Sequence, residues 1–171
     1  MNGPRTSLLV LFLLISSWFQ AGLSSRMELL HARPDFVLTT LVCICILVGT
    51  THGTLLSVWA GFLTAVLAGY NYGSVLISRL ITGALSGALQ QHIIQDNLII
   101  PMVTVFLATW FSEGLYFLMA PNLHSLHWWL HMVLGESLYN AVLAVPIYFG
   151  LRALNYGAEA EHGFNPYIET N

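Results

Sequence analysis

Residues 34–50 read PDFVLTTLVCICILVGT and contain a single charged side chain, that of Asp35. Such a run is close to the length that crosses a bilayer, since about 20 residues span about 30 Å of hydrocarbon as a helix. Similar runs fill most of the 171 residues, of which 8% are charged and 56% hydrophobic. Soluble domains contain about 25% charged residues. The composition therefore predicts an integral membrane protein and excludes disordered, collagen-like and disulfide-rich classes.

The positions at which the apolar runs stop predict an all-α bundle of six membrane-spanning helices. The expected spans cover about residues 7–23, 34–50, 54–69, 74–91, 98–120 and 129–154. Residues 1–155 thus form one transmembrane domain, and residues 156–171 form a short acidic tail that we expect to be disordered. Pro146 predicts a kink in the last span, and the sequence YNYG at residues 70–73 predicts a tight turn.

The first expected span has two interpretations. Arg5, the apolar run after it and the sequence AGLSS at residues 21–25 also resemble a secretory signal peptide. The run is long for a signal peptide, so we favour a retained helix. Six spans place both termini on one side of the membrane, but the arginines are divided almost evenly between the two sides and do not identify it.

Three charged groups lie well inside the expected spans, away from the span ends where Asp35 and Arg152 lie: Arg79, Glu113 and Glu136. Charges at membrane depth are costly, so each marks either a functional site or a structural ion pair. We favour pairing of Arg79 with Glu113 or Glu136, and a proton or substrate relay and a partner-docking surface remain as alternatives. One helical face of the fourth span is polar and contains Arg79, Thr82, Ser86 and Gln90.

Small residues recur at intervals of four in the third and fourth spans. They are Gly61, Ala65, Gly69 and Gly73, followed by the pair Gly83 and Gly87. Helices in lipid associate through close approach of their backbones, which such residues permit. We expect these residues to form packing seams, either within the chain or with the helix of another protein.

The remaining polar residues indicate contacts and not catalysis. Glu136 and Asn140 are one helical turn apart and could clamp a neighbouring helix. No nucleophile with a base beside it has recognisable context, so we expect no enzyme. No phosphate-binding or CxxC motif indicates a cofactor, and the lack of a basic stripe argues against nucleic acid.

Two further groups of residues have ordinary interpretations. His127 and His131 have metal-ligand spacing, with His124 nearby, but the tryptophans at 128 and 129 favour a segment at the membrane interface, and we expect no metal. Cys43 and Cys45 point to nearly opposite faces of a helix. They cannot bridge each other and are expected to act as small hydrophobic residues.

Three stretches, in order along the chain, resemble the rod shape-determining protein MreD family. ARPDFVL at residues 32–38 resembles the family's R-P-D-[FL] entry into its second span. The glycine-rich residues 61–73 are similar to the family's third span and turn. ESLYNA at residues 136–141, followed by Pro146, resembles the E-x-L-x-N pattern of its last span. The resemblance covers roughly residues 6–155.

This resemblance implies a six-helix protein of the bacterial inner membrane, with both termini in the cytoplasm and a fold similar to the S-components of energy-coupling-factor vitamin transporters. It implies binding to MreC and, through MreC, to the elongation machinery of MreB, RodA and a class B penicillin-binding protein. That machinery organises lateral peptidoglycan synthesis and rod shape. The candidate contact residues are Arg33, Asp35, Glu136 and Asn140, with Arg79 and Glu113 as second choices.

The chain departs from the family pattern at two places. The family commonly has an Asp near the end of the third span, where this chain has Gly69, and Asn71 is the nearest polar side chain. The loop after the fourth span is neutral to acidic here and often basic in the family. The fold similarity leaves one alternative, a small-molecule-binding S-component with a polar cavity lined by Arg79, Glu113, Trp110 and the histidines.

Overall fold

The computed structural model describes residues 3–28, 32–89, 99–120 and 125–162, and nearly all of them are helical. The elements are α1 (Gly3–Gly22), the short 3-10 helix η1 (Ser24–Arg26), α2 (Phe36–Val48), α3 (Thr50–Ala68), α4 (Tyr72–Ala88), α5 (Ile99–Met119) and α6 (Leu126–His162). The described residues contain no strand. The prediction of an all-α fold with six helices is thereby confirmed.

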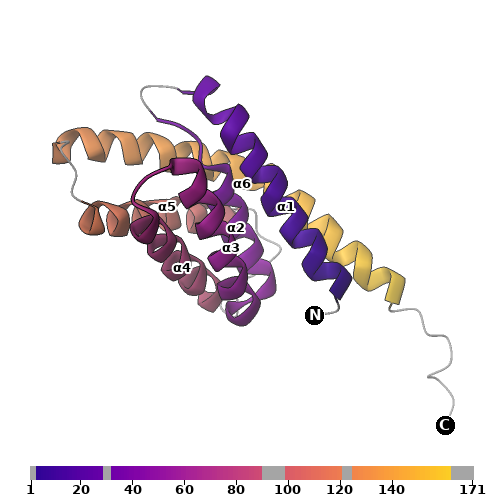
Figure 1. Ribbon diagram of the computed structural model, residues 1–171. Coiled ribbons are helices and arrows are strands. Elements are labelled where there is room, and N and C mark those ends of the chain that lie inside the picture. Colours follow the sequence, from indigo (N-terminus) through magenta and orange to yellow (C-terminus); the bar gives the residue numbers. More distant parts are fainter. Residues whose placement is uncertain (1–2, 29–31, 90–98, 121–124, 163–171) are drawn as a thin grey trace, which may run out of the picture.

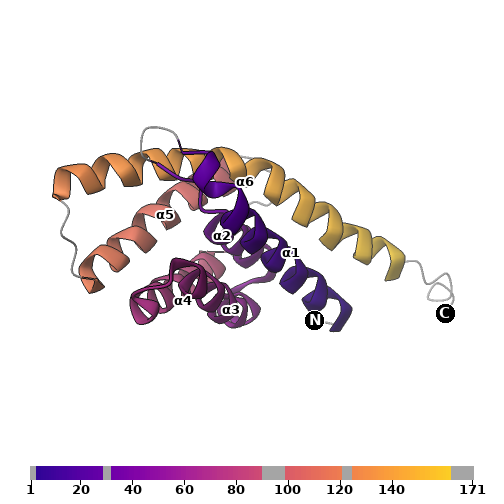
Figure 2. The same ribbon diagram turned by 45° about the horizontal axis from the view of Figure 1, so that its top comes forward.

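Helix α6 extends beyond the last expected span at both of its ends. It begins at Leu126 and continues to His162, through the first part of the expected acidic tail. Residues 163–171 of that tail lie outside the described residues. Figure 2 shows a bend midway along α6, and Pro146 lies near the midpoint. A proline within a helix removes one backbone hydrogen bond, which accounts for a bend there.

Helix α2 forms the core of the bundle. It contacts each of the other five α-helices, and every residue from Val37 to Leu47 is buried. A helix that is apolar on all sides belongs in an interior. Its 13 residues give a length of only about 20 Å. The segment expected as a second span is therefore a short central helix that other helices surround.

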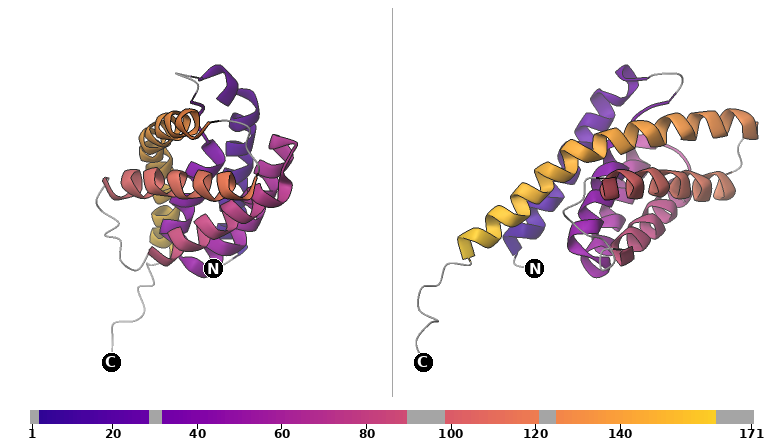
Figure 3. Two further views of the ribbon diagram at one scale, coloured as in Figure 1. Left: turned by 90° about the vertical axis from the view of Figure 1, so that its left-hand side faces the viewer. Right: turned by 180° about the vertical axis from the view of Figure 1, so that it is seen from behind.

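The other helices are arranged around α2 in two groups. Helices α3 and α4 pack against each other on one side, and α5 runs along the first half of α6 on the other (Figures 1 and 2). The beginning of α1 and the end of α6 lie at the same end of the molecule in both views of Figure 3. This arrangement agrees with two termini on one side of a membrane.

Among the described residues, three helices are long and apolar enough to cross a membrane: α3, α5 and the Leu126–Ala153 part of α6. The Ser7–Gly22 part of α1 and the whole of α2 are apolar but shorter. Large apolar side chains such as Trp18, Leu118 and Val142 are exposed on the outer surface. Lipid is the solvent that such a surface requires, so the chain is a membrane protein. That all six helices cross the bilayer stays a prediction.

The small residues take different places in the α3–α4 pair. A Cβ atom on Gly61 would lie 3.2 Å from the Leu76 backbone, and one on Gly87 would lie 2.8 Å from Thr50 Cα. Gly83 similarly faces the Ser57 side chain. These three glycines, together with the buried Ala65, mark close contacts between helices.

Gly69 and Gly73 do not continue this seam, because an added Cβ would meet nothing within 4 Å at either position. Gly69 instead ends α3 in the left-handed region, with φ of 73°. Asn71 follows with φ of 49°, so the predicted turn at residues 70–73 is present. Glycine and asparagine are the residues that tolerate this conformation best.

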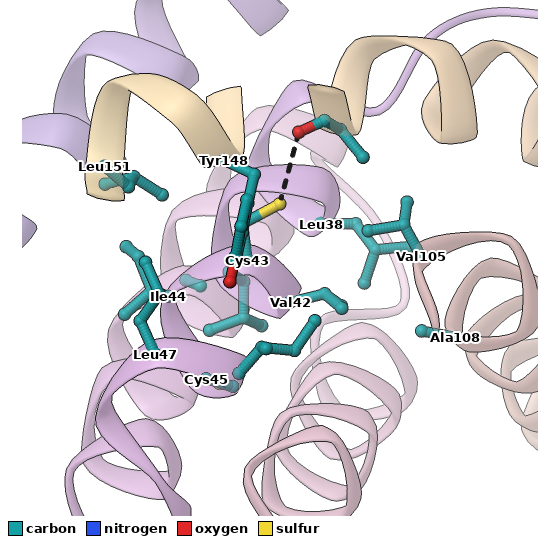
Figure 4. Packing of buried hydrophobic residues seen from close by; sticks show 14 of the residues in the cluster. Leu38, Val42, Cys43, Ile44, Cys45, Leu47, Val105, Ala108, Tyr148 and Leu151 are labelled. Carbon is teal, nitrogen blue, oxygen red and sulfur yellow. Dashed lines mark hydrogen bonds between the residues drawn. The ribbon is translucent and has the colours of Figure 1, made fainter. Parts of the chain in front are cut away.

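The two cysteines are free, in agreement with the prediction that they do not bridge each other, and both are buried in the core. Figure 4 shows Cys43 beside Tyr148 and Val42, with its thiol directed toward the Ala144 carbonyl of α6 at 3.9 Å. Cys45 faces α3, where its sulfur lies 4.0 Å from Ser57 Oγ. Each cysteine therefore packs against a different neighbouring helix.

Candidate functional site: a buried polar network beside an open groove

The network begins where the chain enters α2. Asp35 is the N-cap of α2, and its Oδ1 accepts a hydrogen bond of 2.8 Å from the Leu38 N–H. An aspartate at this position satisfies a helix N–H group that has no partner within the helix. The Asp35 side chain is buried, so its second oxygen needs a partner from the protein.

Arg79, in the middle of α4, supplies that partner. Its Nη2 lies 2.6 Å from Asp35 Oδ2 and 3.3 Å from Glu113 Oε1 on α5, and its Nη1 donates to Ser112 Oγ. The arginine is only 6% exposed. It thus joins α2, α4 and α5 through buried charge-assisted hydrogen bonds, which are stronger than neutral ones. The sequence suggested that Arg79 pairs with Glu113 or Glu136. The contact with Glu113 is present, but the contact with Asp35 is shorter.

Asn140 adds α6 to this network, as its fourth helix after α2, α4 and α5. Its Oδ1 accepts a hydrogen bond of 2.8 Å from the Asp35 backbone N–H, and its Nδ2 donates to Thr109 Oγ1 on α5. Asn140 is fully buried. The clamp expected on the sixth span is therefore an internal one, which holds the entry segment and α5 against α6.

Glu136 lies one turn before Asn140 but occupies a different setting. It is 9% exposed and lines an open groove of about 690 Å³. The groove lies where α1 and α3 end and α2 and α6 begin, and Gln20, Ser24, Asp35, Tyr70 and Trp128 also line it. No described arginine or histidine forms an ion pair with Glu136, whereas Asp35 and Glu113 both pair with Arg79.

Arg33 lies apart from the buried network. Its side chain is 60% exposed, and its guanidinium pairs with Glu28 at 2.7 Å on the rim of the groove. The side chains of Arg33 and Asp35 thus point to different places, although the two residues are neighbours in the expected motif. An exposed pair of this kind contributes little to stability.

Aromatic residues lie around the groove and beside it. Tyr70 follows α3, and burial raises its pKa above the ordinary value, an effect to which the neighbouring Tyr116 adds.

His127 and His131 are exposed at the start of α6, with their Nε2 atoms 3.2 Å apart. The described residues contain no group of three potential metal ligands. His124 and Gln90, which the sequence grouped with these sites, lie outside the described residues.

The cavity expected for an S-component has a different lining from the groove observed. Arg79 and Glu113 are held inside the buried network, and neither they nor Trp110 line the groove. The indole N–H of Trp110 is buried without a hydrogen-bond partner, and its ring packs edge-on against Trp129. Trp110 therefore joins α5 to α6 and does not face the groove.

Several residues of the site were not singled out from the sequence. Ser112 and Thr109 complete the network on α5, and Gln20 on α1 accepts a hydrogen bond of 2.7 Å from the Phe36 N–H. Gly135 permits close approach of α6, because a Cβ there would lie 2.7 Å from Ala32 Cβ. Ser112, Thr109 and Gln20 could have been identified from the sequence, because each is a polar residue within an apolar run.

The comparison with protein families agrees with this arrangement. A family described as rod shape-determining protein MreD matches residues 4–156, which is nearly the whole chain. The chain belongs to the MreD family. Comparisons with curated proteins and with solved structures find no match. In family terms, the R-P-D entry holds the N-cap Asp35, and the last-span pattern holds Glu136 and Asn140.

Membership of the MreD family supports a role in rod shape determination. In the structure, residues of two family-like motifs contact each other. Asp35 from the first motif and Asn140 from the third meet directly, 105 residues apart in sequence. The first and third motifs therefore meet at one internal junction of α2, α4, α5 and α6, with Glu136 at its border with the groove.

Proposed function

We propose that the chain is a non-enzymatic scaffold of the bacterial inner membrane that binds an MreC-type protein. Through this partner it would act with MreB, RodA and a class B penicillin-binding protein in lateral peptidoglycan synthesis, with both of its termini in the cytoplasm. The family match over residues 4–156 is the observation that carries this proposal. The use of Asp35, Arg79 and Asn140 to hold helices together supports a structural role.

The experiment has a cellular part and a biochemical part. Expression of the chain in a rod-shaped bacterium that lacks its own MreD should restore the rod, and the tagged chain should retain MreC from detergent extracts. Gly87→Leu should abolish both effects, because its side chain would collide with the Thr50 backbone. Gly73→Ala, which meets no neighbour, is the matched control. Round cells together with no retention of MreC would contradict the proposal.

A second candidate is the small-molecule-binding S-component of an energy-coupling-factor transporter. The groove favours it, because about 690 Å³ falls within the range of about 300–1,000 Å³ that ligand pockets occupy. Such a protein would be stabilised against heat by its vitamin, since a ligand that binds only the folded state raises the unfolding temperature. If no vitamin raises the unfolding temperature and the chain retains MreC, the S-component role is contradicted and the scaffold role is supported.

A further inference from the structure

The groove has the size and composition of a ligand site. Its volume is about 690 Å³, and it combines polar groups with the apolar side chains of Leu67 and Met132. Trp128 and Tyr70 also line it. Pockets for small molecules are typically apolar with a few polar groups that orient the ligand. The groove meets this description at the end of the bundle where α1 ends and α6 begins.

The charges that line the groove are not balanced. Three carboxyl groups reach it, those of Glu28, Asp35 and Glu136, and Arg33 is the cation among its lining residues. Arg33 pairs with Glu28, and Asp35 pairs with Arg79 from behind the groove. Each of these two carboxylates therefore already has a guanidinium partner.

Glu136 has no such partner among the described residues, although it is more than nine-tenths buried. The Asn140 amide beside it offers Glu136 a hydrogen bond but no charge, and the same amide also contacts the Asp35 N–H and Thr109. A buried carboxylate is costly unless a cation pairs with it. A cation bound in the groove would therefore supply the counter-charge that Glu136 lacks among the described residues.

We propose that the groove binds a small organic cation, and that Glu136 pairs with its ammonium or guanidinium group. The remainder of the ligand would lie against Trp128, Tyr70 and Met132, where aromatic faces also attract a cation. An organic cation fits better than a bare metal ion, because the described residues hold no group of three metal ligands. This site goes beyond the scaffold role and does not depend on MreC.

The test uses the full chain, purified in detergent, and two probes of the same shape. Butylguanidinium carries a charge, and butylurea is its neutral counterpart. Calorimetric titration should show binding of butylguanidinium at least tenfold tighter than that of butylurea. Glu136→Gln, which keeps the shape of the side chain, should remove this difference. Equal binding of the two probes to the unaltered chain would overturn the proposal.

A second variant keeps the test decisive if Glu136→Gln does not fold. Arg33→Gln removes the exposed cation from the groove, together with its ion pair to Glu28. It should bind butylguanidinium severalfold more tightly, and unchanged or weaker binding would overturn the proposal. N-acetyl-arginine amide distinguishes the source of the cation: tighter binding than butylguanidinium would identify a polypeptide side chain, and weaker binding a free small molecule. A chain that restores the rod without binding either cation would leave the scaffold role intact.

Discussion

The carboxylate of Asp35 lies 2.6 Å from the guanidinium of Arg79, and both side chains are buried. The same carboxylate caps α2, so one side chain both begins the central helix and ties it to α4. Because both side chains are almost fully buried, water would solvate either charge poorly if the other were removed. The stability of the bundle should therefore depend strongly on this pair.

We expect Asp35→Asn to destabilise the protein by about 3–5 kcal/mol, because the longer contact with Glu113 would then be the only described ion pair of Arg79. Asparagine is itself a good N-cap, so the loss of charge is isolated from the loss of the cap. Thermal unfolding in detergent, followed by helical circular dichroism, measures the effect. Glu28→Gln, which breaks the exposed pair with Arg33, should cost about 1 kcal/mol or less. Similar losses in the two variants would show that the buried pair is not important.

We expect Gly87→Ala to weaken the packing of α4 against α3. The new methyl group would lie 2.8 Å from Thr50 Cα and 3.0 Å from the Gly49 carbonyl, and these backbone atoms cannot rotate away. Overpacking of this kind costs about 1–3 kcal/mol. Gly73→Ala has open space and should be neutral or slightly stabilising, since alanine favours a helix more than glycine does. Equal unfolding temperatures for the two variants would contradict this packing.

The sequence predicted the helices because apolar runs and their ends are visible in composition alone. It also identified Arg79, since a charge within such a run needs a partner. The choice of that partner depended on knowing where α2 begins. A span over residues 34–50 places Asp35 near the membrane surface, whereas the short buried α2 brings it to Arg79 inside the bundle.

The glycines show a similar limit. Repeats of four indicate that residues share a helical face, but they do not show where the helix ends. Gly61 lies within α3 and packs against Leu76, whereas Gly69 lies after its last residue and turns the chain. Gln20 and Gly135 were missed because their partners, the Phe36 N–H and the Ala32 Cβ, belong to other segments of the chain, and the local sequence does not identify such a partner.

We expect Asn140→Asp to be more damaging than its small change in shape suggests. Asparagine uses its oxygen for the Asp35 N–H and its amide nitrogen for Thr109. Aspartate keeps the first contact, loses the second donor and adds another carboxylate to a cluster that already contains Asp35 and Glu136. A loss of at least about 3 kcal/mol should follow, because an uncompensated charge is buried.

The comparison for Asn140→Asp is Asn140→Ala, which leaves the Asp35 N–H buried without a partner and should cost about 1–3 kcal/mol. Leu138→Ala, at an exposed position of the same helix, controls for changes in α6 itself. The unfolding temperature in detergent should therefore be highest for Leu138→Ala, lower for Asn140→Ala and lowest for Asn140→Asp. A higher temperature for Asn140→Asp than for Asn140→Ala would argue against a carboxylate-rich cluster around this residue.

Finally, the cysteines provide a test of the central position of α2. Cys43 and Cys45 have no exposed surface, and Cys43 lies against α6 while Cys45 lies against α3. A maleimide reagent should therefore leave both thiols unmodified in the folded protein and modify both after denaturation in SDS, as mass spectrometry would show. A Leu118→Cys variant carries a third thiol at a position that is 82% exposed in the native protein, and only this thiol should react before denaturation. Rapid labelling of Cys43 or Cys45 in the folded chain would place α2 at the surface and would contradict the burial of the Asp35 junction that begins it.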